Sequence, residues 1–454
     1  MNEINYYTDK VEDILTGWVT IDEIDLFSEL TINEDGISVR IIDFDMQLNR
    51  SVFYLNNSLP ISFNHLNQGF YLLFGLNIIK SHSMKIGSDK SALVFSFSVQ
   101  GFIYSQRYYI RHDETFPSIS IYGNGVKQWS GPTIKVGNII QKINNHLSPD
   151  DSDLIEFEKD IAGIGSVGLF NSFRYGGING LHSFSLEVDP HIKFTFEQPV
   201  HFEDLIETYT DLYMILRFLI GESISISNVI ISTSSATMSD GIQLYIPEKI
   251  ISNKDYHNGM IMPYSSPYYE QTSNEFPESI WVNYFSPQNK DIKDLLKKYI
   301  TYSMINSQEE QFLGYYRILE TMTLEVSHFV DENDLAVLLN RCKPFLSKKF
   351  PCTSISSFIR AIKTANTKKN NTERCIKHFI KDLPQPIIKK FNLDMINIGE
   401  ICDSRNKIIH QPLFIETREN IYNFRNNVST LAKLAFLIRL GVPTNTIDNR
   451  IHHL

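Results

Sequence analysis

The first half of the chain alternates hydrophobic and polar residues with a period close to two. β-Branched and aromatic residues fill short runs such as LTINEDGISVRIIDF, ALVFSFSVQGFIY, RYYIRH, PSISIYG and FSLEVDPHIKFTF. Glycine, asparagine, aspartate and proline separate these runs at short spacing, as they do between antiparallel strands. The pattern predicts a sandwich-like or barrel-like β-rich domain over residues 1–289.

One segment in this half has a helical period instead. Leu205, Leu212, Leu216 and Leu219 share one face of a predicted helix over 202–221, and Gly221 is a typical helix stop. Two further strands, SISISNVIIST and IQLYIPEKI, are expected after it. The tract from about 255 to 290 is rich in Tyr, Pro, Ser and Asn, so we expect an irregular connection there.

From about residue 291 the hydrophobic period is helical. It predicts helices near 291–304, 307–329, 333–347, 353–367, 371–381, 394–410 and 416–440. Turns with Asn, Pro or charged residues separate them. We therefore expect an α+β chain, in which an all-α bundle over residues 290–454 follows the β-rich domain.

The charge of the chain divides at the same place. Residues 290–454 hold 25 Lys and Arg against 17 Asp and Glu, a net of +8, whereas residues 1–289 hold 17 against 35, a net of -18. The basic part is suited to nucleic acid and the acidic part is not. Taken alone, the split is equally compatible with two ordinary solvated surfaces.

Composition excludes several classes of protein. No stretch is long and apolar enough to span a bilayer, and the N-terminus lacks the pattern of a signal peptide. Cys342, Cys352, Cys375 and Cys402 form no C-x-x-C pair, which argues against a zinc ribbon or a disulfide framework. The histidines show no metal-ligand spacing. We expect a cytoplasmic protein without a membrane segment, a metal or a cofactor.

A formal G-x-G-x-x-G occurs at Gly163, Gly165 and Gly168. A dinucleotide site needs a buried strand before this motif and a helix after it. Here an acidic segment precedes the motif and strands are expected to follow. The three glycines therefore indicate a loop between strands.

The richest chemistry lies near the C-terminus, in the sequence RNKIIH. On the predicted helix, Met395, Ile398, Cys402, Arg405 and Ile409 fall on one stripe. Four of these side chains favour burial, whereas the fifth is a permanent cation that is rarely buried without a partner.

Asn406 and His410 are four residues apart, so they share a neighbouring face of the same helix. Arginine can form two hydrogen bonds to phosphate oxygens, and histidine can transfer protons near neutral pH. The combination is suited to reaction at a phosphodiester.

A carboxylate is expected to support Arg405. Glu320 lies among Leu319, Met322 and Leu324 on a predicted helix that also carries Arg317 on the same face. A carboxylate in a bundle core needs a cation, and Arg405 is the obvious candidate. An ordinary ion pair that orients two helices and a pair that positions Arg405 are both open.

The residues just described resemble a known superfamily. CDSRNKIIH, in a helical C-terminal domain, resembles the signature of HEPN ribonucleases: Arg, a polar residue and, several positions later, His. EEQFLGYYRILETM resembles the long early helix of the Apea-like HEPN group of bacterial anti-phage, abortive-infection proteins. FEDLIETYTDLYMILRFLIG, followed by a strand, is similar to the β-rich domain that precedes HEPN in that group. The resemblance spans nearly the whole chain.

The resemblance implies metal-independent RNA cleavage in a site shared by two HEPN protomers. Arg405, Asn406 and His410 correspond to the active-site motif, and Glu320 is a supporting residue. The partners implied are RNA on the basic bundle, a second copy of the chain, and a phage-derived trigger on the β-rich domain. Two other functions are open: a non-catalytic module that binds RNA or protein, and carbohydrate binding by the β-rich half.

Overall fold

The computed structural model describes residues 7, 13–21, 24–33, 35–45, 60–65, 69–86, 90–111, 113–145, 147–177, 184–234, 241–247, 260–265, 275–328, 330–350, 354–369, 371–411 and 415–451. Cys352 lies outside the described residues. The chain forms two compact units, residues 1–293 and 294–452. Among the described residues, no helix is long and apolar enough to cross a membrane.

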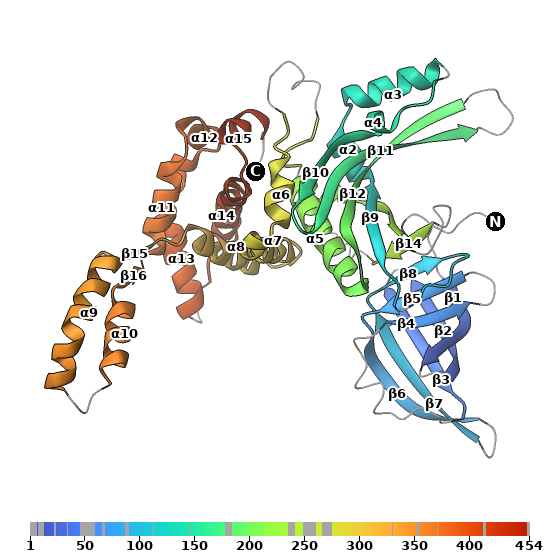
Figure 1. The fold of residues 1–454 in the computed structure, drawn as a ribbon, viewed down its shortest axis with the longest axis horizontal. Helices are drawn as coiled ribbons and strands as arrows, with labels where there is room; N and C mark the ends of the chain where they lie inside the picture. The colour runs from blue at the N-terminus through green and yellow to red at the C-terminus, as the bar shows by residue number, and fades with distance from the viewer. Residues whose placement is uncertain are drawn as a thin grey trace. The chain divides into compact units, whose positions relative to one another are not determined.

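The N-terminal unit is built on an antiparallel sheet (Figure 1). The strands are β1 (Asp13–Ile21), β2 (Ile24–Asn33), β3 (Gly36–Asp43), β4 (Ile61–His65), β5 (Gly69–Phe74), β6 (Asn77–Ile86), β7 (Lys90–Val99), β8 (Gly101–Ser105), β9 (Phe116–Gly123), β10 (Ile155–Ile161), β11 (Gly165–Gly177), β12 (Phe184–Val200), β13 (Ile226–Ser232) and β14 (Ile242–Tyr245). They hydrogen-bond in the order β10-β11-β12-β9-β13-β14-β8-β5-β4-β1-β2-β3-β7-β6.

The alternating sequence pattern explains this sheet. In β2 every second residue from Leu26 to Ile32 is buried, as expected when successive side chains point to opposite faces. The buried face packs on neighbouring strands in one hydrophobic cluster that includes Leu30, Ile41 and Phe95. The antiparallel β-rich fold predicted for the first half is confirmed.

Several helices accompany the sheet: α2 (Asn124–Ser130), α3 (Ile134–Asn144), α4 (Asp151–Leu154), α5 (Phe202–Ile220) and α6 (Ser279–Phe285). The helix predicted over 202–221 is confirmed as α5, which ends before Gly221, a residue with φ 81°. The sequence pattern did not predict α2, α3 or α4. Each is short, and α3 begins where the side chain of Thr133 accepts a hydrogen bond from Val136 N.

The irregular connection predicted for 255–290 was partly wrong. Within it, α6 is a helix, and Trp281 on that helix is fully buried. The Trp281 ring packs edge-on against Trp129, with centroids 6.2 Å apart, and lies near Phe157. The nearby Pro, Ser and Asn residues predict irregular structure, but packing of large aromatic side chains stabilises a helix here.

The glycine motif forms a tight hairpin between β10 and β11. Gly163 and Gly165 have φ of 75° and 150°, which favour glycine. A Cβ on Gly165 would lie 2.0 Å from the carbonyl oxygen of Thr195. The turn therefore favours glycine at 163, the close approach of β12 requires it at 165, and the strand–turn–strand context predicted from the sequence is confirmed.

The second unit is helical, as predicted, apart from one short β ladder. The helix predicted over 307–329 was wrong at its end, because it stops at Thr323 and residues 326–328 form a strand of that ladder. Its helices are α8 (Gln308–Thr323), α9 (Glu332–Lys349), α10 (Ile355–Ala365), α11 (Thr372–Asp382), α12 (Gln385–Lys390), α13 (Ile398–His410), α14 (Arg418–Arg439) and α15 (Thr444–Arg450), and α7 (Lys290–Ser303) leads into it. α8 packs along α14, where the ring centroids of Phe312 and Phe424 are 6.0 Å apart. α7 also contacts α14, since the hydroxyls of Tyr299 and Ser429 are hydrogen-bonded at 2.8 Å.

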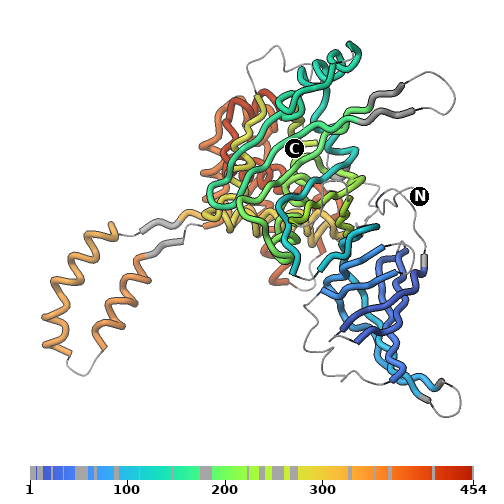
Figure 2. Tube along the Cα trace, turned by 45° about the vertical axis from the view of Figure 1, so that its right-hand side comes forward, coloured from blue at the N-terminus to red at the C-terminus, as the bar shows by residue number. Residues whose placement is uncertain are grey.

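One part of this unit is a hairpin of α9 and α10. A short antiparallel ladder of β15 (Val326–His328) and β16 (Thr367–Lys369) joins it to α8 and α11. Figures 1 and 2 both show the hairpin extending away from the other helices of the bundle. Among the described residues, α9 and α10 pack mainly against each other.

Candidate functional site

Helix α13 carries the RNKIIH sequence. It begins after Asn397, whose side chain accepts a hydrogen bond from Glu400 N at 3.2 Å. Buried Ile398, Ile401 and Cys402 fix the face that it turns toward the bundle. The burial of α13 through these residues sets the direction of the motif side chains that follow.

The apolar stripe on this helix is shorter than predicted. Met395 precedes the helix in a short 3-10 turn and is 80% exposed, and Ile409 is 38% exposed. The predicted helix start at 394 was therefore wrong by four residues, and only Ile398 and Cys402 are buried apolar members of the stripe. A sequence period shows which residues share a face, but not where the neighbouring helices end.

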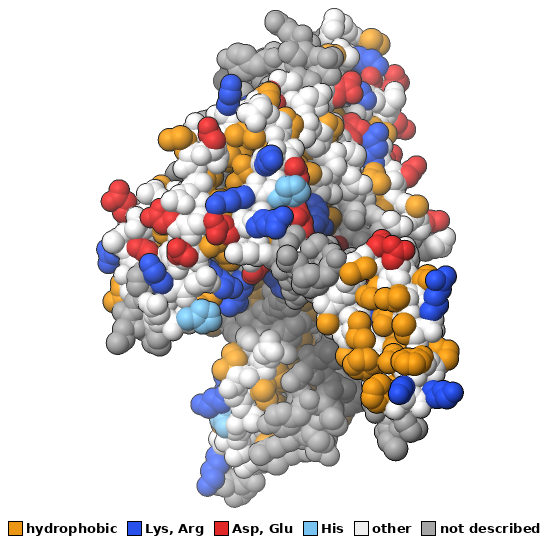
Figure 3. Space-filling view, turned by 90° about the vertical axis from the view of Figure 1, so that its left-hand side faces the viewer, with side chains coloured by type: hydrophobic (Ala, Val, Ile, Leu, Met, Phe, Trp, Pro, Cys, Tyr) orange, Lys and Arg blue, Asp and Glu red, His pale blue; other side chains and the backbone are white. Residues whose placement is uncertain are grey.

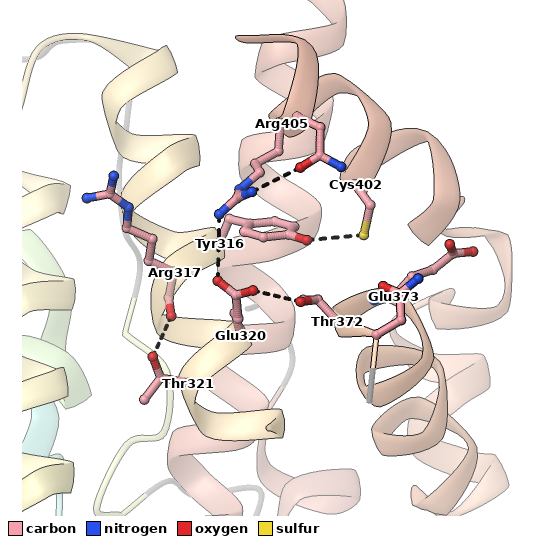
Figure 4. A network of polar contacts seen from close by, with 10 residues as sticks. Tyr316, Arg317, Glu320, Thr321, Thr372, Glu373, Cys402 and Arg405 are labelled. Carbon is pink, nitrogen blue, oxygen red and sulfur yellow. Dashed lines mark hydrogen bonds and ion pairs between the residues drawn. The ribbon is translucent and has the colours of Figure 1, made fainter. Parts of the chain in front are cut away.

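Three contacts hold the side chain of Arg405, which is 22% exposed (Figure 4). Its Nη1 donates to Oδ1 of Asn406 at 2.9 Å. The guanidinium carbon lies 5.3 Å from the centre of the Tyr316 ring, and Nη2 lies 3.8 Å from Oε2 of Glu320. The last distance is too long for a hydrogen bond, so the ring and the amide fix Arg405 more closely than the carboxylate does.

Tyr316 was not predicted from the sequence. It is buried on α8, and its hydroxyl donates to Sγ of Cys402 at 3.2 Å. Burial raises the pKa of Tyr316 and also that of the Cys402 thiol. Both groups are therefore neutral near pH 7, and Cys402 lacks the thiolate character of a nucleophile. The position of Tyr316 one turn before Glu320 was the available sequence signal.

Glu320 connects α8 to α11 as well as to Arg405. Thr372 Oγ1, at the start of α11, donates to Oε1 of Glu320 at 2.6 Å. The Glu320 side chain is 34% exposed, so the expected position inside the bundle core was wrong, although the expected proximity to Arg405 is present. Arg317 lies on the same helix, but its guanidinium points away from Glu320 (Figure 4).

The segment after α13 is tied back to the bundle. Ser404 Oγ donates to Oε2 of Glu416 at 2.6 Å, and Asn420 Nδ2 donates to Oε1 of the same carboxylate at 3.0 Å. The hydrogen bond from Ser404 lowers the pKa of Glu416. This carboxylate therefore anchors α13 to the start of α14, close in sequence to the end of the motif.

His410 is exposed at the last residue of α13, and Asn406 is exposed one turn earlier. Because a helix turns about 100° per residue, Arg405 and His410 leave α13 about 140° apart. The structure thus brings Arg405, Asn406, Glu320 and Tyr316 together, whereas His410 points in another direction. One protomer presents the cation and the imidazole on different sides of the helix.

The comparisons with known proteins concern the N-terminal unit. The family described as ApeA N-terminal domain 1 matches residues 15–267, which is more than half of the 454 residues. No curated protein and no solved structure matches the chain. The matched region begins within β1, includes the sheet through β14 with α5, and ends before α6 begins. The chain therefore belongs to the family of ApeA-like anti-phage proteins.

Proposed function

We propose that the helical unit is a HEPN endoribonuclease that cleaves RNA without a metal ion. The observation that carries this proposal is the half-buried Arg405, held by Tyr316, Glu320 and Asn406 in a sequence that ends with an exposed His410. The anti-phage family of the chain is consistent with an RNA-cleaving effector.

The reaction is a transesterification. The ribose 2′-hydroxyl attacks the adjacent phosphorus, the bond to the 5′-oxygen of the next nucleotide breaks, and a 2′,3′-cyclic phosphate and a 5′-hydroxyl form. His410 transfers a proton as general base or acid. Arg405 stabilises the negative charge that develops on the phosphoryl oxygens. The nucleophile belongs to the substrate, so DNA, which lacks it, is not cleaved.

Two protomers are needed to complete the site. Within one chain, Arg405 and His410 diverge, so a single phosphodiester is better enclosed by the Arg405 of one protomer and the His410 of another. A two-fold axis beside α13 produces two such sites at once. Asn406, bonded to Arg405, has the role of setting the orientation of the guanidinium.

The two units divide the work. The basic helical unit binds the RNA, because phosphate contacts by Lys and Arg release counterions. The acidic N-terminal unit repels nucleic acid and is available to recognise a phage-derived trigger. Activation requires that the trigger bind the active arrangement of the chain better than the resting one.

The test is cleavage of total tRNA by the purified protein in EDTA. His410→Ala is expected to lower the rate roughly 10²–10⁴-fold, the usual effect of removing a general acid or base. His201→Ala, at an exposed histidine of the acidic N-terminal unit, is the matched control and keeps the parent rate. A folded His410→Ala protein that cleaves at the parent rate contradicts the proposal. The products are expected to carry 2′,3′-cyclic phosphate ends.

Arg405 is tested by two substitutions. Arg405→Ala is expected to be as severe as His410→Ala, and Arg405→Lys recovers only part of the rate because the planar fork is lost. Mixing Arg405→Ala chains with His410→Ala chains restores partial activity if each site takes one residue from each protomer. A strictly monomeric active enzyme by light scattering contradicts the shared site.

A further inference from the structure

The α9–α10 hairpin has a hydrophobic face that no described residue covers. Within the hairpin, Leu339 packs against Ile355 and Ile359. Large hydrophobic side chains next to these packed positions are exposed instead: Leu338 57%, Phe345 63% and Phe358 48%. Figure 3 shows hydrophobic side chains gathered on this hairpin, with basic side chains at their border.

These side chains lie on the same broad face of the hairpin. Leu338, Phe345 and Phe358 each come immediately before a residue that packs between the two helices, namely Leu339, Leu346 and Ile359. They are therefore rotated by the same angle from the packed stripe. Because α9 and α10 run antiparallel, equal rotations place side chains on one side of the pair.

Along α9 this face has a self-complementary order. Asp334, Leu338, Phe345 and Lys349 are all exposed and are separated by four, seven and four residues. At these spacings they lie on one side of a helix. The spacing is the same when read in either direction, whereas the charge at one end is negative and at the other end positive.

We propose that this face, Asp334, Leu338, Phe345 and Lys349 with Phe358 beside them, binds the same face of a second copy of the chain. In an antiparallel pair centred between Arg341 and Cys342, Leu338 lies against Phe345 of the second copy. Asp334 then lies against Lys349 of the second copy, at both ends of the contact. This arrangement is an isologous two-fold interface, and it does not depend on the proposed ribonuclease function.

The order of charges along α9 favours a protein over a nucleic acid as the binding partner of this face. A polyanion is bound by cations distributed along its path, whereas here carboxylates occupy one end of the helix and hydrophobic side chains the middle. Arg341 lies on the side of this face away from α10, where it remains in solvent. A second copy satisfies both ends of the helix at once.

The contact is expected to be weak. Helix α9 is about 27 Å long and about 10 Å wide, and a strip of this size is smaller than the ~800 Å² per partner of a stable interface. The contact therefore adds to another association, or forms as the concentration rises. The molecular mass in solution cannot test this contact, because a dimer formed through α13 would have the same mass whether or not the hairpins associate. The experiment must therefore report on the hairpin itself.

Disulfide trapping provides that readout. In a Cys342→Ser, Cys352→Ser background, full-length Leu338→Cys and Phe345→Cys chains with different tags are mixed and oxidised. The mixed disulfide is expected, because these positions face each other. Two Leu338→Cys chains are not expected to cross-link, since about 10 Å along the axis separates their equivalent positions, beyond disulfide reach. Absence of the mixed disulfide, or equal yields in all combinations, overturns the proposal.

Charge exchange tests the ends of the contact in the same assay. Asp334→Lys or Lys349→Asp alone is expected to slow mixed-disulfide formation roughly tenfold, since two ion pairs become repulsive in the symmetric contact. Both changes in one chain restore the rate. Lys343→Asp, on another side of α9, is the matched control. If the double variant still forms the mixed disulfide slowly, the face does not bind a second copy. The same conclusion follows if Phe345→Glu weakens RNA binding and leaves the association of the hairpins unchanged.

Discussion

The two units differ in the sign of the charges that they bury. Among the described residues, the buried charged side chains of the N-terminal unit are acidic and those of the helical unit are basic. They are Asp43, Glu114 and Asp211 in the first unit, and Arg425, Lys433 and Arg450 in the second. The excess of acidic residues before position 290 and of basic residues after it therefore extends from the surface into the interior.

This difference affects the electrostatic potential that each unit presents to a polyanion such as RNA. Surface charges are screened by salt within about 8 Å at physiological ionic strength, whereas buried charges are screened much less. Burial lowers the pKa of Lys433 to about 8, whereas the guanidinium groups of Arg425 and Arg450 keep their charge. Arg425 is held by Gln311 at 3.1 Å. Part of the positive potential of the bundle is thus built into its core.

The largest effect that we expect on the stability of either unit concerns His191, a neutral side chain in the acidic unit. His191 is buried between Tyr122, stacked at 4.4 Å, and Phe170, and burial lowers its pKa to about 4. The unfolded chain takes up a proton near pH 6.5 and the folded chain only near pH 4, so stability falls as the pH drops through this window. The loss approaches about 3 kcal/mol.

Urea unfolding at pH 7, 5.5 and 4.5 measures this dependence. His191→Phe keeps the aromatic stack and is expected to flatten the pH dependence by the stated amount. His201→Gln, at an exposed histidine of the same unit, is expected to leave it as in the parent. Equal pH dependence in His191→Phe and the parent would show that His191 does not contribute.

A smaller effect tests how the basic unit holds its cation. Tyr316→Leu removes the ring face beside Arg405 and is expected to lower kcat for RNA cleavage roughly tenfold, since such a cation–π contact contributes about 0.5–2 kcal/mol. Tyr316→Phe keeps the ring and removes only the bond to Cys402, so kcat is expected to stay within about threefold.

The contrast between these two variants is the informative quantity. A fall in kcat with little change in KM identifies a role in orienting Arg405 for the reaction. Similar losses in both variants would show that the hydroxyl, rather than the ring, is the important part. Thermal unfolding of each variant controls for damage to the bundle core.

The smallest expected effect separates the two surfaces. Arg374→Glu with Lys381→Glu, both exposed on α11, is expected to weaken RNA binding a few-fold at physiological salt. It should also reduce the slope of log K against log salt by about one for each phosphate that the variant no longer binds. Lys80→Glu with Lys85→Glu on β6 changes the charge of the acidic unit equally and is expected to have no effect. If the β6 pair has the larger effect, the assignment of RNA to the bundle is wrong.

The sequence predicted the regular elements better than the surroundings of the site. Strong periodicity placed α5 and α14 within two residues of their ends, because amphipathic patterns are local. The helix predicted over 307–329 ends six residues early, at Thr323 of α8. The exposure of Met395 and Ile409 was missed, since it depends on where neighbouring helices stop. Short helices such as α2 and α6 were missed for a related reason, because their stability comes from tertiary packing.

The candidate site shows the same limit. Arg405 and Glu320 could be paired from the sequence, because a charge among hydrophobic residues requires a partner. Tyr316 could not be recognised as the third contact, because a tyrosine on an amphipathic helix usually belongs to the core. Only the packing of α8 against α13 shows that its ring lies beside the guanidinium.

The ladder of β15 and β16 makes the α9–α10 hairpin a modular insertion. Val326 pairs with Lys369, so the chain leaves and re-enters the bundle at adjoining points, with Cα atoms about 5 Å apart. The segment between these points can become longer or shorter, or change in sequence, without altering the path of the chain from α8 to α11. These two helices carry Tyr316, Glu320 and Thr372. Changes in the hairpin are thus expected to leave the residues around Arg405 in place.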